Sequence, residues 1–211
     1  MNNRAKVLAV QLPAPCPLAC DFCRTPRHAE GNVDAVFERV VAELPRYEEL
    51  YLTSNGETGL STIFKKLVDA SQNLGIKVSV LCATERSVVP GLSRVEVSLN
   101  EYTRPLALRA IEKARSLDIP VVVSMVDDGK SDAIDLESVA KANGADGVMM
   151  RALRMEGRSG NERGSTRIYR KPGSEMGFFP VPAYAELVGH GETPVCVDHF
   201  GCVVSLLGSP A

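Results

Sequence analysis

The sequence lacks a run of about 18 apolar residues, the length that a membrane-spanning helix needs. It also has no secretory signal, no internal repeat and no low-complexity tract. Its six cysteines are not spread over a small loop-rich scaffold, which argues against a disulfide framework. We therefore expect a cytoplasmic protein with reduced thiols and no membrane partner.

Neither sign of charge is in clear excess. The chain of 211 residues has 24 Lys and Arg against 26 Asp and Glu, a net charge of −2 and an isoelectric point of about 6.0. This balance gives no global electrostatic footprint for nucleic acid, so only a local basic patch could serve such a partner. The length is that of one domain with a substantial core.

Strand-like and helix-like segments alternate along most of the chain. The strand-like segments are residues 6–12, 49–53, 76–82, 94–99, 121–126 and 147–151. Helical periodicity is found at residues 33–44, 61–74, 104–117 and 131–142. Asn32 can cap the first helix, and Gly75 can end the second. The alternation predicts an α/β fold with a parallel sheet and helical crossovers.

The pattern changes after residue 151. A segment rich in Gly, Arg and Ser follows, and residues 157–177 show no periodicity. A hairpin is expected near the end of the chain, with its turn at about residues 198–201. We predict a core of residues 1–151 and a β-rich extension of the same domain, residues 152–211, that closes or lines one end of the core.

Three cysteines follow the first predicted strand at the spacing C-x3-C-x2-C. Cys16, Cys20 and Cys23 supply soft thiolates, which select iron–sulfur or zinc over magnesium or calcium. They can hold three irons of a [4Fe–4S] cube and leave the fourth iron to a small chelator, such as the amino and carboxylate groups of S-adenosylmethionine. A structural zinc site normally has four ligands, which His28 could complete. Chance clustering at a strand end is a further alternative.

This cysteine motif after a first strand resembles that of the radical SAM superfamily. The resemblance implies a partial (β/α)6 TIM-like barrel with the cysteine loop at its mouth, at the carboxyl ends of the strands. It also implies that a reduced [4Fe–4S] cluster cleaves S-adenosylmethionine to methionine and a 5′-deoxyadenosyl radical. A reducing protein such as flavodoxin or ferredoxin would supply the electron. Phe22 would shield the cluster, the alternative being simple packing in a surface loop.

Residues 53–58, Thr-Ser-Asn-Gly-Glu-Thr, resemble the glycine-rich motif that follows the second strand in this superfamily. The backbone of that motif binds the amino group of the cofactor's methionine portion. Gly56 and Glu57 match the usual Gly-Gly-Glu-Pro pattern, whereas Asn55 and Thr58 depart from it. The alternative interpretation is an ordinary Asn-Gly turn.

Polar residues on the fourth and fifth strands extend the predicted cofactor site. Residues 97–100, Val-Ser-Leu-Asn, resemble the family's frequent Val-Ser-Leu-Asp. Ser98 and Asn100 alternate onto one face, from which they can reach the carboxylate or ribose of the cofactor. Ser124 could add a hydrogen bond, or could be satisfied by backbone groups alone.

Residues 148–158 resemble the sixth strand and Gly-Arg turn of a branch that includes molybdenum-cofactor cyclases and peptide-modifying SPASM enzymes. Met150 is expected either to flank adenine or to fill the core. Arg151 offers a planar guanidinium to a carboxylate.

Residues 151–171 contain seven basic residues against two acidic ones. Arg154, Arg158 and Arg163 are therefore candidate ligands for an anionic substrate, unless the segment is a solvated loop.

The last predicted hairpin, residues 194–204, resembles a shortened C-terminal hairpin of SPASM and Twitch proteins. Cys196 and Cys202 could ligate an auxiliary cluster, but two residues cannot fill four iron sites, and Cys82 lies on a different element. Two reduced thiols in a small β-structure are the simpler account.

The resemblance thus implies a biosynthetic radical SAM enzyme, and the basic segment favours a small anionic metabolite or cofactor precursor as substrate. A peptide-modifying or protein-modifying enzyme and a glycyl-radical activase are alternatives within the superfamily. Only 15 residues precede Cys16, which disfavours a peptide-recognition domain ahead of the barrel. A noncatalytic iron–sulfur or zinc module is the alternative of another class, and it predicts a closed metal site that is indifferent to S-adenosylmethionine.

Overall fold

The computed structural model describes residues 5–18, 20, 31–54, 56–127, 133–152, 168–169, 195–197 and 203–205. The strands are β1 (Ala5–Leu12), β2 (Tyr47–Ser54), β3 (Lys77–Cys82), β4 (Arg94–Ser98), β5 (Val121–Asp127), β6 (Gly147–Ala152), β7 (Ile168–Tyr169), β8 (Val195–Val197) and β9 (Val203–Ser205). The helices are α1 (Val33–Glu43), α2 (Phe64–Asn73), α3 (Arg104–Ser116) and α4 (Ala133–Ala142), with short 3-10 helices η1 (Leu44–Arg46), η2 (Thr58–Leu60) and η3 (Glu85–Ser87).

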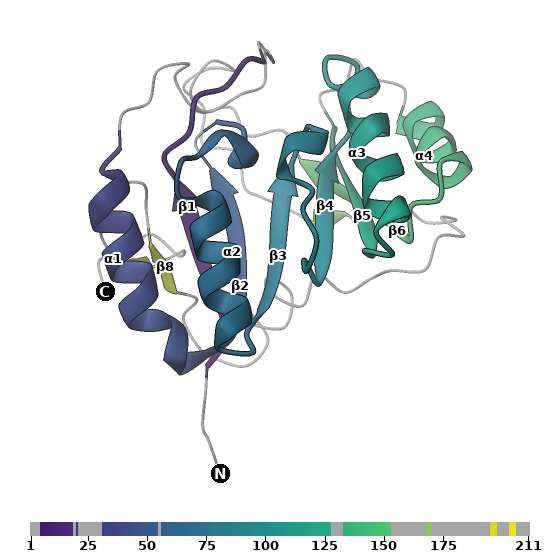
Figure 1. The fold of residues 1–211 in the computed structure, drawn as a ribbon. Helices are drawn as coiled ribbons and strands as arrows, with labels where there is room; N and C mark the ends of the chain where they lie inside the picture. Colours follow the sequence, from purple (N-terminus) through teal and green to yellow (C-terminus); the bar gives the residue numbers. More distant parts are fainter. Residues whose placement is uncertain are drawn as a thin grey trace.

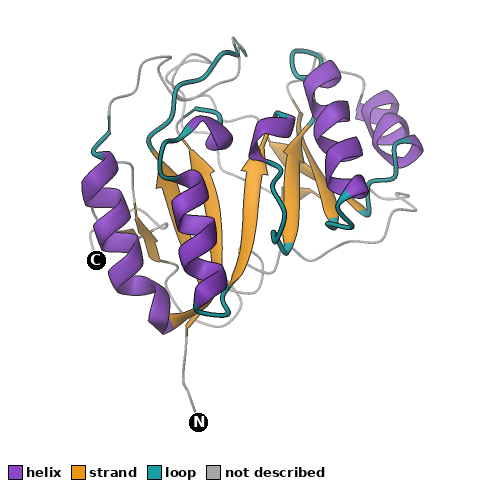
Figure 2. Ribbon diagram, viewed as in Figure 1, coloured by secondary structure: helices purple, strands orange, loops and turns teal. Residues whose placement is uncertain are grey.

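The strands form one sheet in the order β7-β6-β5-β4-β3-β2-β1-β8-β9. Strands β1 to β6 pair in parallel in chain order, and helices α1 to α4 cover one side of the sheet (Figure 1 and Figure 2). The fold is therefore the predicted α/β partial (β/α)6 barrel. The later described strands join the same sheet: β7 pairs antiparallel with β6, and β8 pairs in parallel with β1 and forms the expected antiparallel hairpin with β9.

The helix boundaries follow local sequence signals. The side chain of Asn32 accepts a hydrogen bond from the Ala35 N–H at 3.0 Å and caps α1 as predicted. Gly75 follows α2 with φ +68°, the left-handed conformation that glycine adopts at little cost. Not every apolar side chain of α1 is buried, since Val41 is 36% exposed. It lies next to Val40, which occupies the buried face.

The core lies between the helices and the face of the sheet that they cover. Alternate residues along β1 to β5, together with the residue that follows β4, are buried on this helix-facing side. They are Leu8, Val10, Leu12, Leu50, Leu52, Val78, Val80, Cys82, Val95, Val97, Leu99, Val121, Val123 and Met125. Because strand side chains alternate between faces, the remaining residues of these strands lie on the opposite face, inside the curve of the barrel.

The inner face of the barrel carries a buried polar network. The Tyr51 hydroxyl of β2 donates to the Glu96 carboxylate of β4 at 2.8 Å. Nearer the amino ends of the strands, Glu49 accepts from the Ser79 hydroxyl and pairs with Arg94 at 3.3 Å. The interior is therefore polar at these positions, whereas the helix-facing side is apolar.

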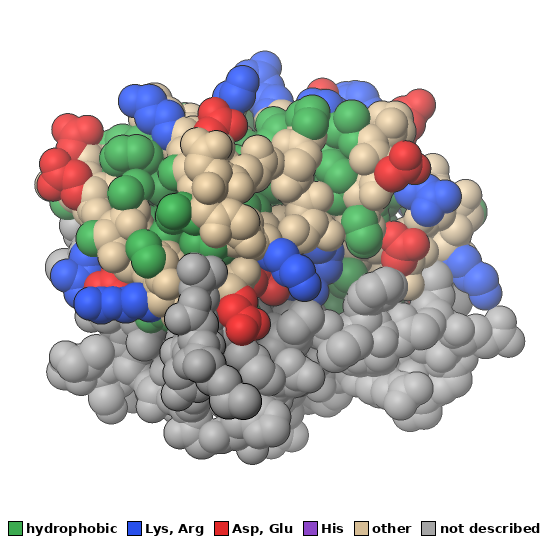
Figure 3. Space-filling view, turned by 60° about the horizontal axis from the view of Figure 1, so that its bottom comes forward, with side chains coloured by type: hydrophobic (Ala, Val, Ile, Leu, Met, Phe, Trp, Pro, Cys, Tyr) green, Lys and Arg blue, Asp and Glu red, His purple; other side chains and the backbone are tan. Residues whose placement is uncertain are grey.

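None of the helices in the described ranges is both long and apolar enough to cross a membrane. The face seen in Figure 3 carries acidic and basic side chains side by side, without a large area of one sign.

Candidate functional site

The cysteine loop directly follows β1, at the carboxyl edge of the parallel sheet. Cys16 is partly buried and Cys20 is 8% exposed, and both are thiols. Cys23, Phe22 and His28 lie outside the described residues. Among the residues that are described, no group of three His, Cys, Asp or Glu side chains could hold a metal ion. The structure thus places two of the three predicted ligands in this loop.

The loop after β2 is packed against the cysteine loop. A Cβ atom added to Gly56 would lie 2.1 Å from the Ala14 carbonyl oxygen and 2.6 Å from that of Pro15, so only glycine fits here. The Glu57 N–H donates to the Pro15 carbonyl at 3.0 Å, one residue before Cys16. The two segments that the sequence singled out are therefore in direct contact. Asn55 lies outside the described residues.

The Glu57 side chain connects this loop to the segment after β3. Its carboxylate is 2% exposed and accepts hydrogen bonds from the Ala83 N–H at 3.0 Å, the Thr84 hydroxyl at 3.0 Å and the Ser87 hydroxyl at 2.6 Å. We call these four residues the Glu57 network. Burial raises the pKa of the Glu57 carboxyl, and the hydrogen bonds oppose that rise only in part.

The raised pKa of Glu57 predicts a pH-dependent stability. Because the folded protein binds this proton more tightly than the unfolded chain, the associated stability is fully present below the unfolded-state pKa and is lost as the pH rises through the folded-state pKa. Glu57→Gln has no proton to lose, so the free energy of unfolding of the wild type should fall relative to this variant as the pH rises from acid. Urea denaturation across a pH series measures the difference, and parallel curves for the two proteins would contradict the expectation.

Asn100 lies just beyond β4 and is 2% exposed. Its Oδ1 accepts from the Thr103 N–H at 3.1 Å, and the Thr103 hydroxyl accepts from the Asn100 N–H at 3.1 Å. The Asn100 Nδ2 atom is buried and has no hydrogen-bond partner within the described structure. A buried amide donor of this kind suits an acceptor-bearing ligand, because leaving it unsatisfied is costly.

Ser98 and Ser124 are register partners on β4 and β5. Ser98 is partly exposed and Ser124 is buried. The Ser124 carbonyl accepts from the Leu99 N–H at 2.9 Å, which joins the ends of the two strands. The structure therefore brings two of the predicted polar residues together, with Asn100 two positions beyond Ser98.

The register of β6 against β5 assigns Met149 and Met150 to opposite faces of the sheet. Met150 pairs with Met125, a helix-facing core residue, whereas the buried Met149 pairs with Ser124. A shift of one residue along a strand exchanges the two faces. Met150 therefore shares the register face of Met125. Arg151 lies two positions beyond Met149 and therefore shares its register face.

The remaining predicted residues are divided between described and undescribed parts of the chain. Arg154, Arg158, Arg163 and Cys202 lie outside the described residues. Cys196 pairs with Ala9 in the register of β8 and β1. Cys82 is a buried thiol whose pKa is raised well above its usual range, first by burial and then by Glu57 and Glu96.

Several residues of the site were not found from the sequence. The pattern Asn-x-x-Thr before a helix could have indicated the pairing of Asn100 with Thr103, because these residue types commonly bond to nearby backbone groups. No local signal joins Glu57 to Ser87, which lies 30 residues away.

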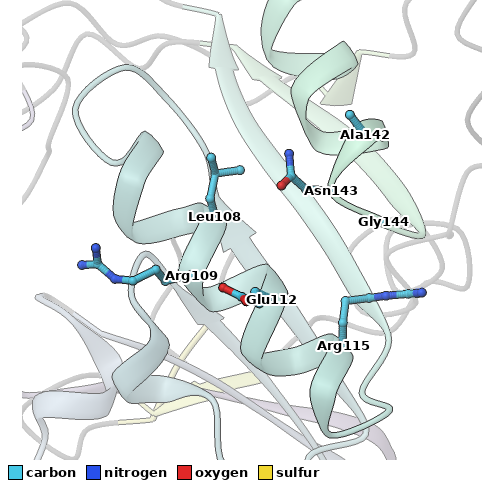
Figure 4. A pocket seen from close by; sticks show the side chains of 7 residues that line it. All are labelled: Leu108, Arg109, Glu112, Arg115, Ala142, Asn143 and Gly144. Atoms are coloured by element: carbon cyan, nitrogen blue, oxygen red, sulfur yellow. The ribbon is translucent and has the colours of Figure 1, made fainter.

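A separate hollow lies on the outside of the barrel, between α3 and the turn that follows α4. It has a volume of about 620 Å³ and is lined by Leu108, Arg109, Glu112, Arg115, Ala142, Asn143 and Gly144. Arg109 and Arg115 extend in opposite directions from it (Figure 4). Its lining shares no residue with the predicted site.

No protein-family model matches the sequence, and no curated protein matches it significantly. The fold does match solved structures. Streptococcus suis SuiB, bound to the precursor peptide SuiA, matches over 72% of this chain and 40% of its own, with a TM-score of 0.54 and 14% identity. TYW1, with a lysine–pyruvate adduct bound, matches over 74% of this chain and 66% of its own, with a TM-score of 0.53 and 12% identity. The chain thus spans less than half of SuiB, and at these identities the likeness concerns the fold.

Proposed function

We propose that this protein is a radical SAM enzyme in which Cys16, Cys20 and Cys23 hold three irons of a [4Fe–4S] cluster. The main observation in support is the contact of the Gly56–Glu57 segment with Ala14 and Pro15, which directly precede Cys16 at the carboxyl edge of the sheet. The fold it shares with SuiB and TYW1, which are radical SAM enzymes, supports the proposal. When bound, the reduced cluster supplies the electron that cleaves S-adenosylmethionine to methionine and a 5′-deoxyadenosyl radical.

The chain's own residues would bind and orient S-adenosylmethionine. The backbone of residues 55–57 would bind its amino group, and the buried Asn100 amide would donate to its carboxylate or ribose. Ser98 and Ser124 would add hydrogen bonds from the neighbouring strand ends. Arg151 would complete the cofactor site from β6, and Phe22 would shield the cluster.

The substrate proposed is a small anionic metabolite or cofactor precursor, attracted by Arg154, Arg158 and Arg163. A peptide is the second candidate, because SuiB was solved with a precursor peptide bound. A small reducing protein such as flavodoxin or ferredoxin would supply electrons.

Low-temperature EPR of the anaerobically reconstituted, dithionite-reduced protein tests this function. We expect a [4Fe–4S] signal that changes when S-adenosylmethionine is added, because one iron is open to the ligand. A signal that does not change would indicate a closed cluster, and tightly bound zinc without a cube would indicate a structural metal site. Either result would overturn the proposal.

A further inference from the structure

The backbone and the side chain of Glu57 contact two different parts of the protein. The backbone N–H donates toward the cysteine loop, at Pro15, while the carboxylate accepts three hydrogen bonds from the segment after β3. The three contacts of the carboxylate are buried, so loss of these donors would leave a buried charged group unsatisfied, which is costly. Pro15, which accepts from the backbone N–H, is an exposed residue.

We infer that Glu57 is a positioning residue, whose carboxylate holds the Gly56–Glu57 backbone against the cysteine loop from the β3 side. One part of its test, the EPR signal of the cluster, rests on the proposed function. It assigns the Glu57 side chain to the protein framework, as a link between the loop after β2 and the segment after β3.

The far side of the Glu57 network is itself anchored. The Ser87 hydroxyl, which donates to Glu57, also accepts from the Gly59 N–H at 2.7 Å. The short helix η3 is held by α3, because Lys113 donates to the Glu85 carbonyl at 2.9 Å and Arg109 pairs with the Glu85 carboxylate at 3.4 Å. Glu57 is thus fixed to an element that is packed on the barrel.

Comparison of Glu57→Ala with Glu57→Gln tests whether the hydrogen bonds of this side chain position the backbone. Alanine removes the acceptor, whereas the glutamine oxygen can still accept from the Ala83 N–H and its amide can donate to the hydroxyls of Thr84 and Ser87. Glu43→Ala is the matched control, since Glu43 is a buried carboxylate that pairs with Arg39 and Arg46 at the other end of β2.

Two measurements are made on each variant. NMR-detected hydrogen exchange of the Glu57 amide in the iron-free full chain should accelerate about tenfold or more in Glu57→Ala, as its hydrogen bond to Pro15 loosens. In the reconstituted protein, the EPR change caused by S-adenosylmethionine should be lost in Glu57→Ala and retained in Glu57→Gln and Glu43→Ala.

Unchanged amide exchange in Glu57→Ala would overturn the inference, as would equal loss of the EPR change in the alanine and glutamine variants. If the wild type gives no cluster that responds to S-adenosylmethionine, the proposed function fails, while the exchange data still decide the positioning role. If Glu57→Ala does not fold, Ser87→Ala removes one donor to the same carboxylate and should shift both readouts in the same direction by less.

Discussion

Gly56→Ala is expected to destabilise the protein by about 3 kcal/mol or more and to prevent it from retaining iron. The added Cβ would lie 2.1 Å from the Ala14 carbonyl oxygen, and this neighbour is backbone, which cannot rotate away. The cysteine loop must therefore move, and Cys16 moves with it. Urea denaturation and iron content after reconstitution measure the two effects.

Gly75→Ala is the matched control for this substitution. Gly75 has φ +68° and no atom near the position of an added Cβ, so alanine there costs about 1–2 kcal/mol through its backbone conformation alone. It lies after α2 and should leave iron binding unchanged. Equal iron loss in the two variants would show that the contact of Gly56 with the cysteine loop is not what matters.

The sequence was informative about the fold because its signals are local. The alternation of apolar strands and amphipathic helices predicted the order of elements, and Asn32 and Gly75 marked two helix ends through groups that lie within a few residues. The 3-10 helices η2 and η3 were not predicted, because three residues do not establish a period.

The site was harder to predict because its contacts join distant parts of the chain. The cysteine spacing and the Gly-Glu pair were visible, but the bond from Glu57 to Ser87 depends on how the loops after β2 and β3 meet. The face of the sheet that Met150 shares depended on strand register, which the sequence did not determine.

Cys20→Ala is expected to abolish the [4Fe–4S] cluster and, with it, reductive cleavage of S-adenosylmethionine. A cube held by three cysteines loses one of its protein ligands, and no other cysteine of the described structure lies in the same loop except Cys16. Iron content, the EPR signal and the formation of 5′-deoxyadenosine after reduction check the result.

Cys82→Ala is the control that distinguishes the loss of an iron ligand from the loss of a buried side chain. Cys20 and Cys82 are both buried thiols, so each alanine variant removes a similar volume and should cost about 1–2 kcal/mol of stability. Cys82 lies on β3 among helix-facing core residues, and burial raises the pKa of its thiol well above its usual range, which disfavours the thiolate that binds iron. The Cys82 variant should therefore keep its cluster. Retained cleavage by Cys20→Ala, or cluster loss in both variants, would reject the assignment of the cysteine loop as the cluster site.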